Sequence, residues 1–143
     1  KIKVAKKSTV SDDFLIIARI ESFILGKNLR DALKRAEAYS RAGADAILIH
    51  SKEKNPKQIF DFSKKFVKSS YYKPLICVPS SYSQVKEKEL IKNGFKMVIY
   101  ANHLMRSSYP SMLNTAKNIL KSRRSSPIEK NISSVKDMIE LIK

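Results

Sequence analysis

The hydrophobic residues of the chain gather in four short runs, separated by longer stretches that mix apolar and polar positions. The runs are rich in Ile, Leu and Val and cover residues 14–20, 46–50, 75–79 and 97–101. Each run is almost continuously apolar, which is typical of strands that are covered on both faces of a parallel sheet. The pattern therefore predicts alternating strands and helices, an α/β fold.

The stretches between and after the runs carry the 3-and-4 spacing of amphipathic helices. The clearest of these helices lies between Asn28, placed as its N-cap, and Gly43, placed to end it. Further helices are expected at about residues 56–67, 83–92, 107–120 and 134–142.

The strand–helix unit repeats at a nearly constant length. The runs begin at residues 14, 46, 75 and 97, an average spacing of about 28 residues that is close to the unit of a (β/α)8 TIM barrel. Four units plus a C-terminal helix amount to half of such a barrel. An open doubly wound sheet is the alternative, but no Gly-rich fingerprint or Walker loop follows any run, so nucleotide binding is not expected. Because half a barrel leaves two strand edges unpaired, the other half is expected as a partner.

Composition narrows the class of protein. With 143 residues, 43% of them hydrophobic, the chain has the size and apolar content of one folded domain. Its net charge of +16 suggests nucleic-acid binding, but the basic residues are spread along the chain and no zinc-finger, RNP or basic-zipper pattern accompanies them. No nucleic-acid partner is therefore expected. A basic scaffold or nucleic-acid-binding module remains the alternative that is not an enzyme.

Cysteine usage and hydropathy suggest where the protein resides. The single cysteine, Cys77, has no partner for an internal disulfide, and no apolar run approaches the roughly 18–20 residues that span a bilayer. These features predict a soluble, cytoplasmic protein without a membrane partner. Cys77 itself lies within an apolar run and is expected to be a small core hydrophobe. The chain begins at Lys1 rather than Met, so we expect a cut or processed N-terminal end.

Candidate site residues stand where the runs end, because ligands of parallel α/β folds bind at the carboxyl ends of the strands. Arg19 lies in an otherwise apolar run, where an unpaired guanidinium is costly, so it is expected either to pair with Glu21 or to clamp an anion. His50 ends the next run and can donate to a phosphoryl or carbonyl oxygen, or act as an acid or base near neutral pH. After the last run, Asn102 and His103 are expected either to cap the next helix or to contact the ligand.

Several of these segments are familiar as a set. FLIIARIE at residues 14–21, AGADAILIHS at residues 42–51 and MVIYANH at residues 97–103 closely resemble the C-terminal half of the phosphoenolpyruvate mutase family. This family belongs to the phosphoenolpyruvate mutase and isocitrate lyase superfamily. The resemblance covers nearly the whole chain, and His50 stands where the carbon–carbon lyases of the superfamily typically carry a glutamate.

The resemblance implies an isomerase that interconverts phosphoenolpyruvate and phosphonopyruvate, making the carbon–phosphorus bond of phosphonate biosynthesis. Arg19 and His50 match the family's residues that hold the phosphoryl end, and Ser51 is expected to bind substrate beside them. The family's Mg²⁺ ligands, carboxylate-binding loop and gating loop belong to the N-terminal half, so no metal ligand is expected in this chain. Phosphonopyruvate hydrolase or another superfamily lyase is the alternative enzyme.

The end of the chain is expected to serve assembly. We interpret residues 1–143 as the C-terminal half of one barrel domain, with residues 121–143 forming a polar linker and a last helix. That helix has an apolar stripe including Ile132, Val135 and Ile142, and Ser134 with Asp137 resembles a capping box. The resemblance implies a homo-oligomer, a dimer or tetramer, in which this helix is exchanged between subunits.

Overall fold

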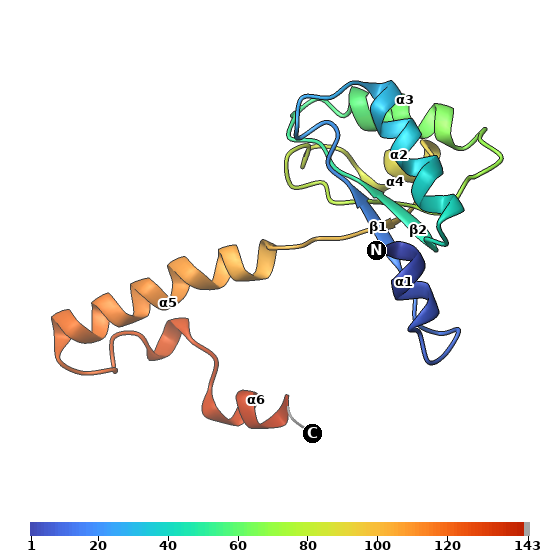
Figure 1. Cartoon of the computed structure of the whole chain (residues 1–143). Coiled ribbons are helices and arrows are strands. Elements are labelled where there is room, and N and C mark those ends of the chain that lie inside the picture. The colour runs from blue at the N-terminus through green and yellow to red at the C-terminus, as the bar shows by residue number, and fades with distance from the viewer. Residues whose placement is uncertain (142–143) are drawn as a thin grey trace. The chain divides into compact units, whose positions relative to one another are not determined.

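The computed structural model describes residues 1–141 and divides into two units, Lys1–Ala101 and a second unit that begins at Asn102. Figure 1 labels the elements of both. The first unit contains a four-stranded parallel sheet in the order β1-β2-β3-β4. The strands are β1 (Ile17–Ile20), β2 (Ala46–Ile49), β3 (Leu75–Cys77) and β4 (Phe95–Val98). The helices of this unit are α1 (Ile2–Lys7), α2 (Leu29–Arg41), α3 (Lys57–Phe66) and α4 (Glu87–Lys92).

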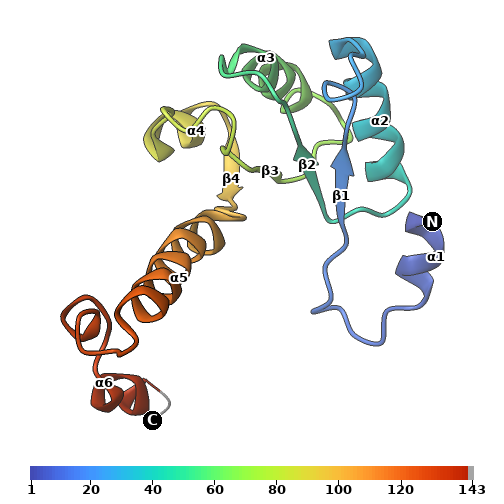
Figure 2. The ribbon, with the colours of Figure 1, turned by 90° about the vertical axis from the view of Figure 1, so that its left-hand side faces the viewer.

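The alternation of strands and helices confirms the predicted α/β fold. Each pair of consecutive strands is parallel and joined through a helix, as in a (β/α) barrel. The views from the side show α2, α3 and α4 on one side of the sheet (Figure 2). The predicted helix ends at Asn28 and Gly43 are also confirmed, since the Asn28 side chain accepts a hydrogen bond from the Asp31 backbone N–H and Gly43 has a φ of 103°.

Strand boundaries differ from the hydrophobic runs. Phe14 and Leu15 belong to the first run, but they are exposed and precede β1. Asp45 binds the backbone of Ile16, the residue just before the strand. The Asp45 carboxylate accepts the Ile16 N–H at 2.8 Å, and the Asp45 N–H donates to the Ile16 carbonyl at 2.8 Å. The last run begins at Met97, but β4 begins two residues earlier, at Phe95, which pairs with Leu75 ahead of a register shift.

The face of the sheet that carries the helices holds the main core. Its cluster includes alternate strand residues and the inward sides of α2 and α3. Ala32 and Ala36 of α2 are fully buried, and these small side chains let the helix approach the sheet closely. Phe62 and Phe66 of α3 are fully buried and stack with their ring centroids 5.4 Å apart.

The opposite face is covered only along its middle. Ala46, Leu48, Ile76 and Val78 form a small buried cluster there. The outer strands present Ile17 and Met97 to the same face, and these side chains are 41% and 49% exposed. The expectation that all four strands are covered on both faces is therefore wrong for β1, which alternates exposed and buried residues, and for β4. Both are edge strands of the four-stranded sheet, so each has a neighbouring strand on one side only.

The pattern of hydrophobic positions does not predict the helix α1. It buries none of its residues fully, although Ile2 packs against the main core. Its position depends on a polar contact instead, because the Lys6 ammonium lies 2.8 Å from the Asp45 carboxylate. Asp45 thus fastens both α1 and the start of β1 to the turn before β2.

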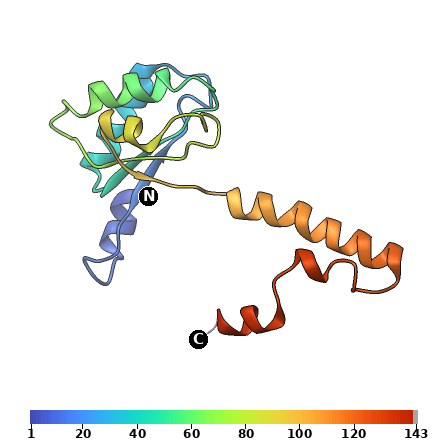
Figure 3. The ribbon, with the colours of Figure 1, turned by 180° about the vertical axis from the view of Figure 1, so that it is seen from behind.

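The second unit consists of α5 (His103–Ser122), a short 3-10 helix η1 (Glu129–Asn131) and α6 (Val135–Glu140), which Figure 3 shows from behind. The helix α5 begins four residues earlier than predicted, continues through Pro110 and buries none of its residues. The predicted start of α6 is confirmed, since Ser134 Oγ accepts the Asp137 N–H at 3.1 Å. Ile142, expected in the same helix, lies outside the described residues.

The stretch that was expected to be a polar linker has local structure of its own. Arg123 ends α5 in the left-handed region, with a φ of 55°. Ile128 is buried, with 5% of its surface exposed, and its N–H donates to the Ser125 carbonyl at 2.8 Å. Within residues 1–141, no helix combines the length and the apolar character that crossing a membrane requires.

Candidate functional site

The polar side chains predicted for the site stand at the carboxyl ends of β1 and β2. Arg19 pairs in register with Leu48, and Ile20 with Ile49. Continuing this parallel register sets Glu21 opposite His50, one residue beyond each strand. Because side chains alternate along a strand, Arg19, Glu21 and His50 belong to the incompletely covered face of the sheet. The structure therefore brings Arg19 and His50 together as the sequence predicts.

Arg19 and Glu21 form an ion pair in which the guanidinium Nε–H donates to Glu21 Oε1. The pairing expected as one alternative for Arg19 is thus present. It uses only the Nε side of the guanidinium, and the two terminal NH₂ groups make no hydrogen bond to any residue from 1 to 141. An anion can therefore still bind at the end of the side chain, so the two alternatives are compatible.

His50 is half-buried at the end of β2. Its pKa is lowered from 6.5, first by burial and then by the positive charge of Arg19, while Glu21 acts in the opposite direction. The imidazole is therefore mainly neutral at pH 7, with one nitrogen that donates and one that accepts. The Nδ1 atom is buried and has no hydrogen-bond partner among the described residues.

Ser51 follows His50 and is almost completely buried. Its hydroxyl donates to Gln58 Oε1 at 2.7 Å and accepts the Glu53 N–H at 3.2 Å. These contacts fasten the start of the loop after β2 to α3. The expected contact between Ser51 and substrate stays a prediction.

A hydrogen-bonded loop holds Glu21 after β1. The Ser22 hydroxyl donates to Asp31 Oδ2 at 2.7 Å, and the same oxygen accepts Arg35 Nε–H at 2.8 Å. The Arg35 guanidinium, followed by the Ser22 hydroxyl, lowers the pKa of Asp31. Sequence reasoning missed this support, although the spacing of Asp31 and Arg35, four residues apart on one helix, was a visible signal.

Ser80 follows the third strand, at one of the strand ends where candidate site residues are expected. Its hydroxyl oxygen is buried without a hydrogen-bond partner in the part of the chain that the structure describes, as is His50 Nδ1. Buried polar atoms normally have partners, so these two atoms are exceptions within residues 1–141.

The described residues do not fit a divalent cation. Within residues 1–141, no three His, Cys, Asp or Glu side chains come together as a metal site. The carboxylate beside Arg19 already accepts its Nε–H, and the guanidinium charge disfavours a cation at the same place. Asn102, after the last strand, occupies the N-cap position of α5 without a side-chain cap hydrogen bond.

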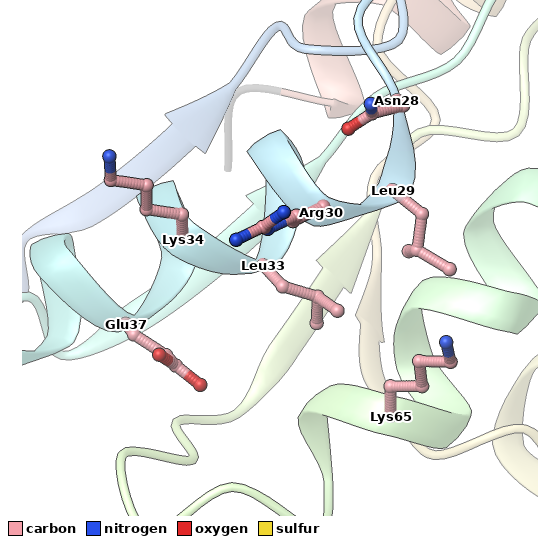
Figure 4. Close-up of a pocket in the computed structure, with 7 residues that line it drawn as sticks. All are labelled: Asn28, Leu29, Arg30, Leu33, Lys34, Glu37 and Lys65. Atoms are coloured by element: carbon pink, nitrogen blue, oxygen red, sulfur yellow. The ribbon is translucent and has the colours of Figure 1, made fainter.

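Two other features do not belong to the strand-end cluster. A surface hollow of about 700 Å³ lies between α2 and α3, and Figure 4 shows the side chains that line it, none of which is Arg19, His50 or Ser51. Cys77 is fully buried, and burial raises the pKa of its thiol to about 12, so it is neutral in the core as expected.

The whole chain is similar to known proteins. A protein-family model described as phosphoenolpyruvate phosphomutase matches residues 1–120. The chain is 43% identical to a phosphoenolpyruvate phosphomutase of Tetrahymena pyriformis, over 99% of the chain and 46% of that protein. It is 35% identical to a phosphonopyruvate hydrolase of Variovorax sp., over 99% of the chain and 48% of that protein. The chain thus spans about half the length of the curated relatives it matches.

Solved structures agree with these matches. The structure of a phosphoenolpyruvate phosphomutase from Streptomyces platensis subsp. rosaceus superposes with a TM-score of 0.90 at 39% identity, covering 98% of this chain and 48% of that one. A phosphonopyruvate hydrolase in complex with oxalate and Mg²⁺ superposes with a TM-score of 0.89 at 35% identity, covering 99% of this chain and 49% of that one. The described sheet and helices therefore correspond to half of a longer barrel.

Proposed function

The chain belongs to the phosphoenolpyruvate phosphomutase family, and from this we propose that it is the C-terminal half of an enzyme that interconverts phosphoenolpyruvate and phosphonopyruvate. The observation that carries the proposal is that Arg19 and His50 lie close together at the carboxyl ends of adjacent parallel strands, where the charge of Arg19 acts on the imidazole. Their chemistry suits a phosphoryl group, since one offers a fixed positive charge and the other a neutral donor.

The reaction is a rearrangement within one molecule. In the direction of phosphonate formation, the bond between phosphorus and the enol oxygen breaks, a bond between phosphorus and the methylene carbon forms, and the enol becomes a ketone. The charge of the moving phosphoryl group is spread over three oxygens. In our proposal the terminal NH₂ groups of Arg19 and an N–H of His50 donate to these oxygens, and neither residue gains or loses a proton overall.

Within residues 1–141, no group of three or more His, Cys, Asp or Glu side chains is placed to hold a metal ion. The solved hydrolase relative binds Mg²⁺ and oxalate. We propose that the full-length protein also uses Mg²⁺, held by residues outside this chain, and that the role of residues 1–143 is confined to the phosphoryl end and to completing the barrel.

Hydrolysis is the second candidate, because a phosphonopyruvate hydrolase is 35% identical to the chain. In that reaction water receives the phosphoryl group, and the products are phosphate and pyruvate. The ³¹P NMR spectrum of the full-length protein with phosphonopyruvate and Mg²⁺ distinguishes the two. A phosphoenolpyruvate signal supports the mutase, a phosphate signal without it supports the hydrolase, and no change of the substrate signal refutes both.

The variant Arg19→Lys tests the proposed phosphoryl contact. Lysine keeps the charge but loses the forked pair of donors, so turnover is expected to fall by about 100-fold or more with the fold unaltered. Arg41→Lys is the matched control, because Arg41 lies over the Tyr71 ring, 5.1 Å from its centre, rather than at a strand end. Near wild-type turnover of Arg19→Lys would remove Arg19 from the site.

For the assembly we propose a homo-oligomer in which α6 packs on a neighbouring subunit. This helix exposes Val135, Met138, Ile139 and Leu141. Such an apolar set on a short helix is unfavourable in water, and an exchanged helix would cover it in a symmetric oligomer. Light scattering of the full-length protein at micromolar concentration tests this proposal, and a strictly monomeric mass would contradict it.

A further inference from the structure

We propose that Glu21 is a positioning residue that fixes the orientation of the Arg19 guanidinium, so that its two terminal NH₂ groups are presented to the phosphoryl group. The inference rests on the proposed function, in which Arg19 binds that group. It concerns a residue that does not itself touch substrate. A carboxylate beside an anion site would otherwise be unfavourable, so its presence there needs a reason.

The geometry of the pair provides the first argument. Arg19 lies in β1 and Glu21 lies one residue beyond its end, on the same face of the sheet, so the backbone holds the two side chains close together. The contact is made by the Arg19 Nε–H and Glu21 Oε1. A guanidinium has five N–H donors, and four of them belong to the terminal NH₂ groups. The contact therefore occupies the side of the fork and leaves its end available for an anion.

The anchoring of Glu21 provides the second argument. Its carbonyl accepts the Leu25 N–H at 3.0 Å, and the next residue, Ser22, accepts the Lys27 N–H at 2.8 Å. The Ser22 hydroxyl is in turn bound to Asp31 of α2, and Phe23 is buried in the main core. The loop after β1 is thus tied to both the helix and the core. A carboxylate carried by such a loop can orient a long, flexible side chain.

The negative charge of Glu21 makes the proposal testable by the direction in which ligand binding changes when Glu21 is substituted. Without a positioning role, Glu21 only competes with the anion for Arg19 and repels it, so removing its charge would strengthen binding. With a positioning role, removing the acceptor oxygen weakens binding, because Arg19 must then be ordered when the ligand binds. The two hypotheses therefore predict changes in opposite directions for the same substitution.

The experiment compares Glu21→Ala, Glu21→Gln and Asp61→Asn in the full-length protein, with phosphonopyruvate and Mg²⁺. Glutamine keeps an oxygen that can accept the Arg19 Nε–H, whereas alanine does not. We expect kcat/KM to fall about 10-fold or more for Glu21→Ala and to stay within about 3-fold of wild type for Glu21→Gln. Asp61→Asn removes a carboxylate from an exposed ion pair with Lys57 on α3, and is expected to leave kcat/KM unchanged.

A second measurement reports the pair without catalysis. The Arg19 Nε–H gives a resolvable signal in ¹⁵N NMR, identified by its loss in Arg19→Lys. We expect this signal to shift and its proton to exchange faster in Glu21→Ala, and to remain near its wild-type position in Glu21→Gln. If wild type fails to turn over phosphonopyruvate, the proposed function fails, while this signal still decides whether the pair orders Arg19.

Several outcomes would overturn the proposal. One is a rise of kcat/KM in both Glu21→Ala and Glu21→Gln, since it would show that Glu21 only competes with the ligand. Another is a fall in Glu21→Ala with no change in the Arg19 Nε–H signal. If Glu21→Ala fails to fold, Glu21→Gln decides, because a fall of more than about 10-fold in that folded variant contradicts a role through the acceptor oxygen.

Discussion

The two faces of the sheet in Lys1–Ala101 are built from neighbouring residues of the same strands, yet they differ in completeness. On one face, α2, α3 and α4 cover the strands, and large side chains such as Phe62 and Phe66 are fully buried. On the other face only a narrow central cluster is buried, while Ile17 and Met97 remain well exposed. The first face is a fully packed core, and the second is part of a barrel interior that this chain covers only in its middle.

The candidate site belongs to the incompletely covered face of the sheet. Arg19 and His50 stand at its carboxyl end. Alternate residues of each strand therefore serve different purposes: those on the covered face pack in the core, and those on the other face include the groups that suit a ligand. The stability of the covered face and the chemistry of the other face should respond to different substitutions.

The largest expected effect is loss of all turnover when residues 1–143 are separated from the rest of the barrel. Arg19 and His50 offer charge-assisted hydrogen bonds of about 1.5–3 kcal/mol each, against roughly 4–15 kcal/mol lost on association. We expect no turnover of phosphonopyruvate by residues 1–143 with Mg²⁺, and recovery when the N-terminal half is added. Mutase activity from residues 1–143 alone would contradict the proposal that the site needs both halves.

Core substitutions compare the two faces directly. Phe62→Ala on the covered face is expected to lower the free energy of unfolding by about 3–5 kcal/mol, both in the full-length protein and in residues 1–143. Met97→Ala, on the other face, should cost less than about 1 kcal/mol in residues 1–143 and about 2–5 kcal/mol in the full-length protein. Denaturant unfolding measures both. An equal cost of Met97→Ala in the two proteins would show that the missing half does not cover this face.

The Asp45 contacts give a smaller effect at the opposite end of the strands. Asp45→Asn weakens the bonds to the Ile16 N–H and the Lys6 ammonium, and should lower the free energy of unfolding by about 1 kcal/mol. The Ile16 N–H, followed by Lys6, lowers the pKa of Asp45 from 3.8, so this contribution is present above that value and is lost as the pH falls below it. Wild type should therefore lose its advantage over Asp45→Asn in acid, and an advantage that persists there would contradict the assignment.

The smallest expected effect is the pH dependence that His50 gives to stability. Because its pKa in the folded protein is lowered from 6.5, the unfolded chain binds the proton more readily. The contribution of neutral His50 is therefore complete above pH 6.5 and declines as the pH falls from 6.5 to the lowered pKa. Unfolding measured between about pH 5 and pH 8 should show this decline in wild type but not in His50→Asn. A decline that survives in His50→Asn would assign it to another group.

The element types and their order could be predicted from local pattern alone. The four apolar runs, the Asn28 cap and the Gly43 stop lead to β1 through β4 and α2, because short continuous apolar runs indicate strands of a parallel sheet and the 3-and-4 spacing between them indicates amphipathic helices. The strand-end rule also located Arg19 and His50, since parallel strands carry their ligand-binding residues at one edge. These features depend on neighbours within a few residues, or on the repeat of one unit.

Other features were decided only by tertiary contacts. The start of β1 depends on Asp45, a residue 29 positions from Ile16, and α1 depends on an ion pair 39 positions apart. The lowered pKa of His50 results from burial and from the positive charge of Arg19 on the adjacent strand. A linear pattern records which residues are apolar and how they are spaced. It does not record which strand is at the edge, so the exposure of Ile17 and Met97 became visible only when the strands were paired, because burial depends on what lies across the sheet.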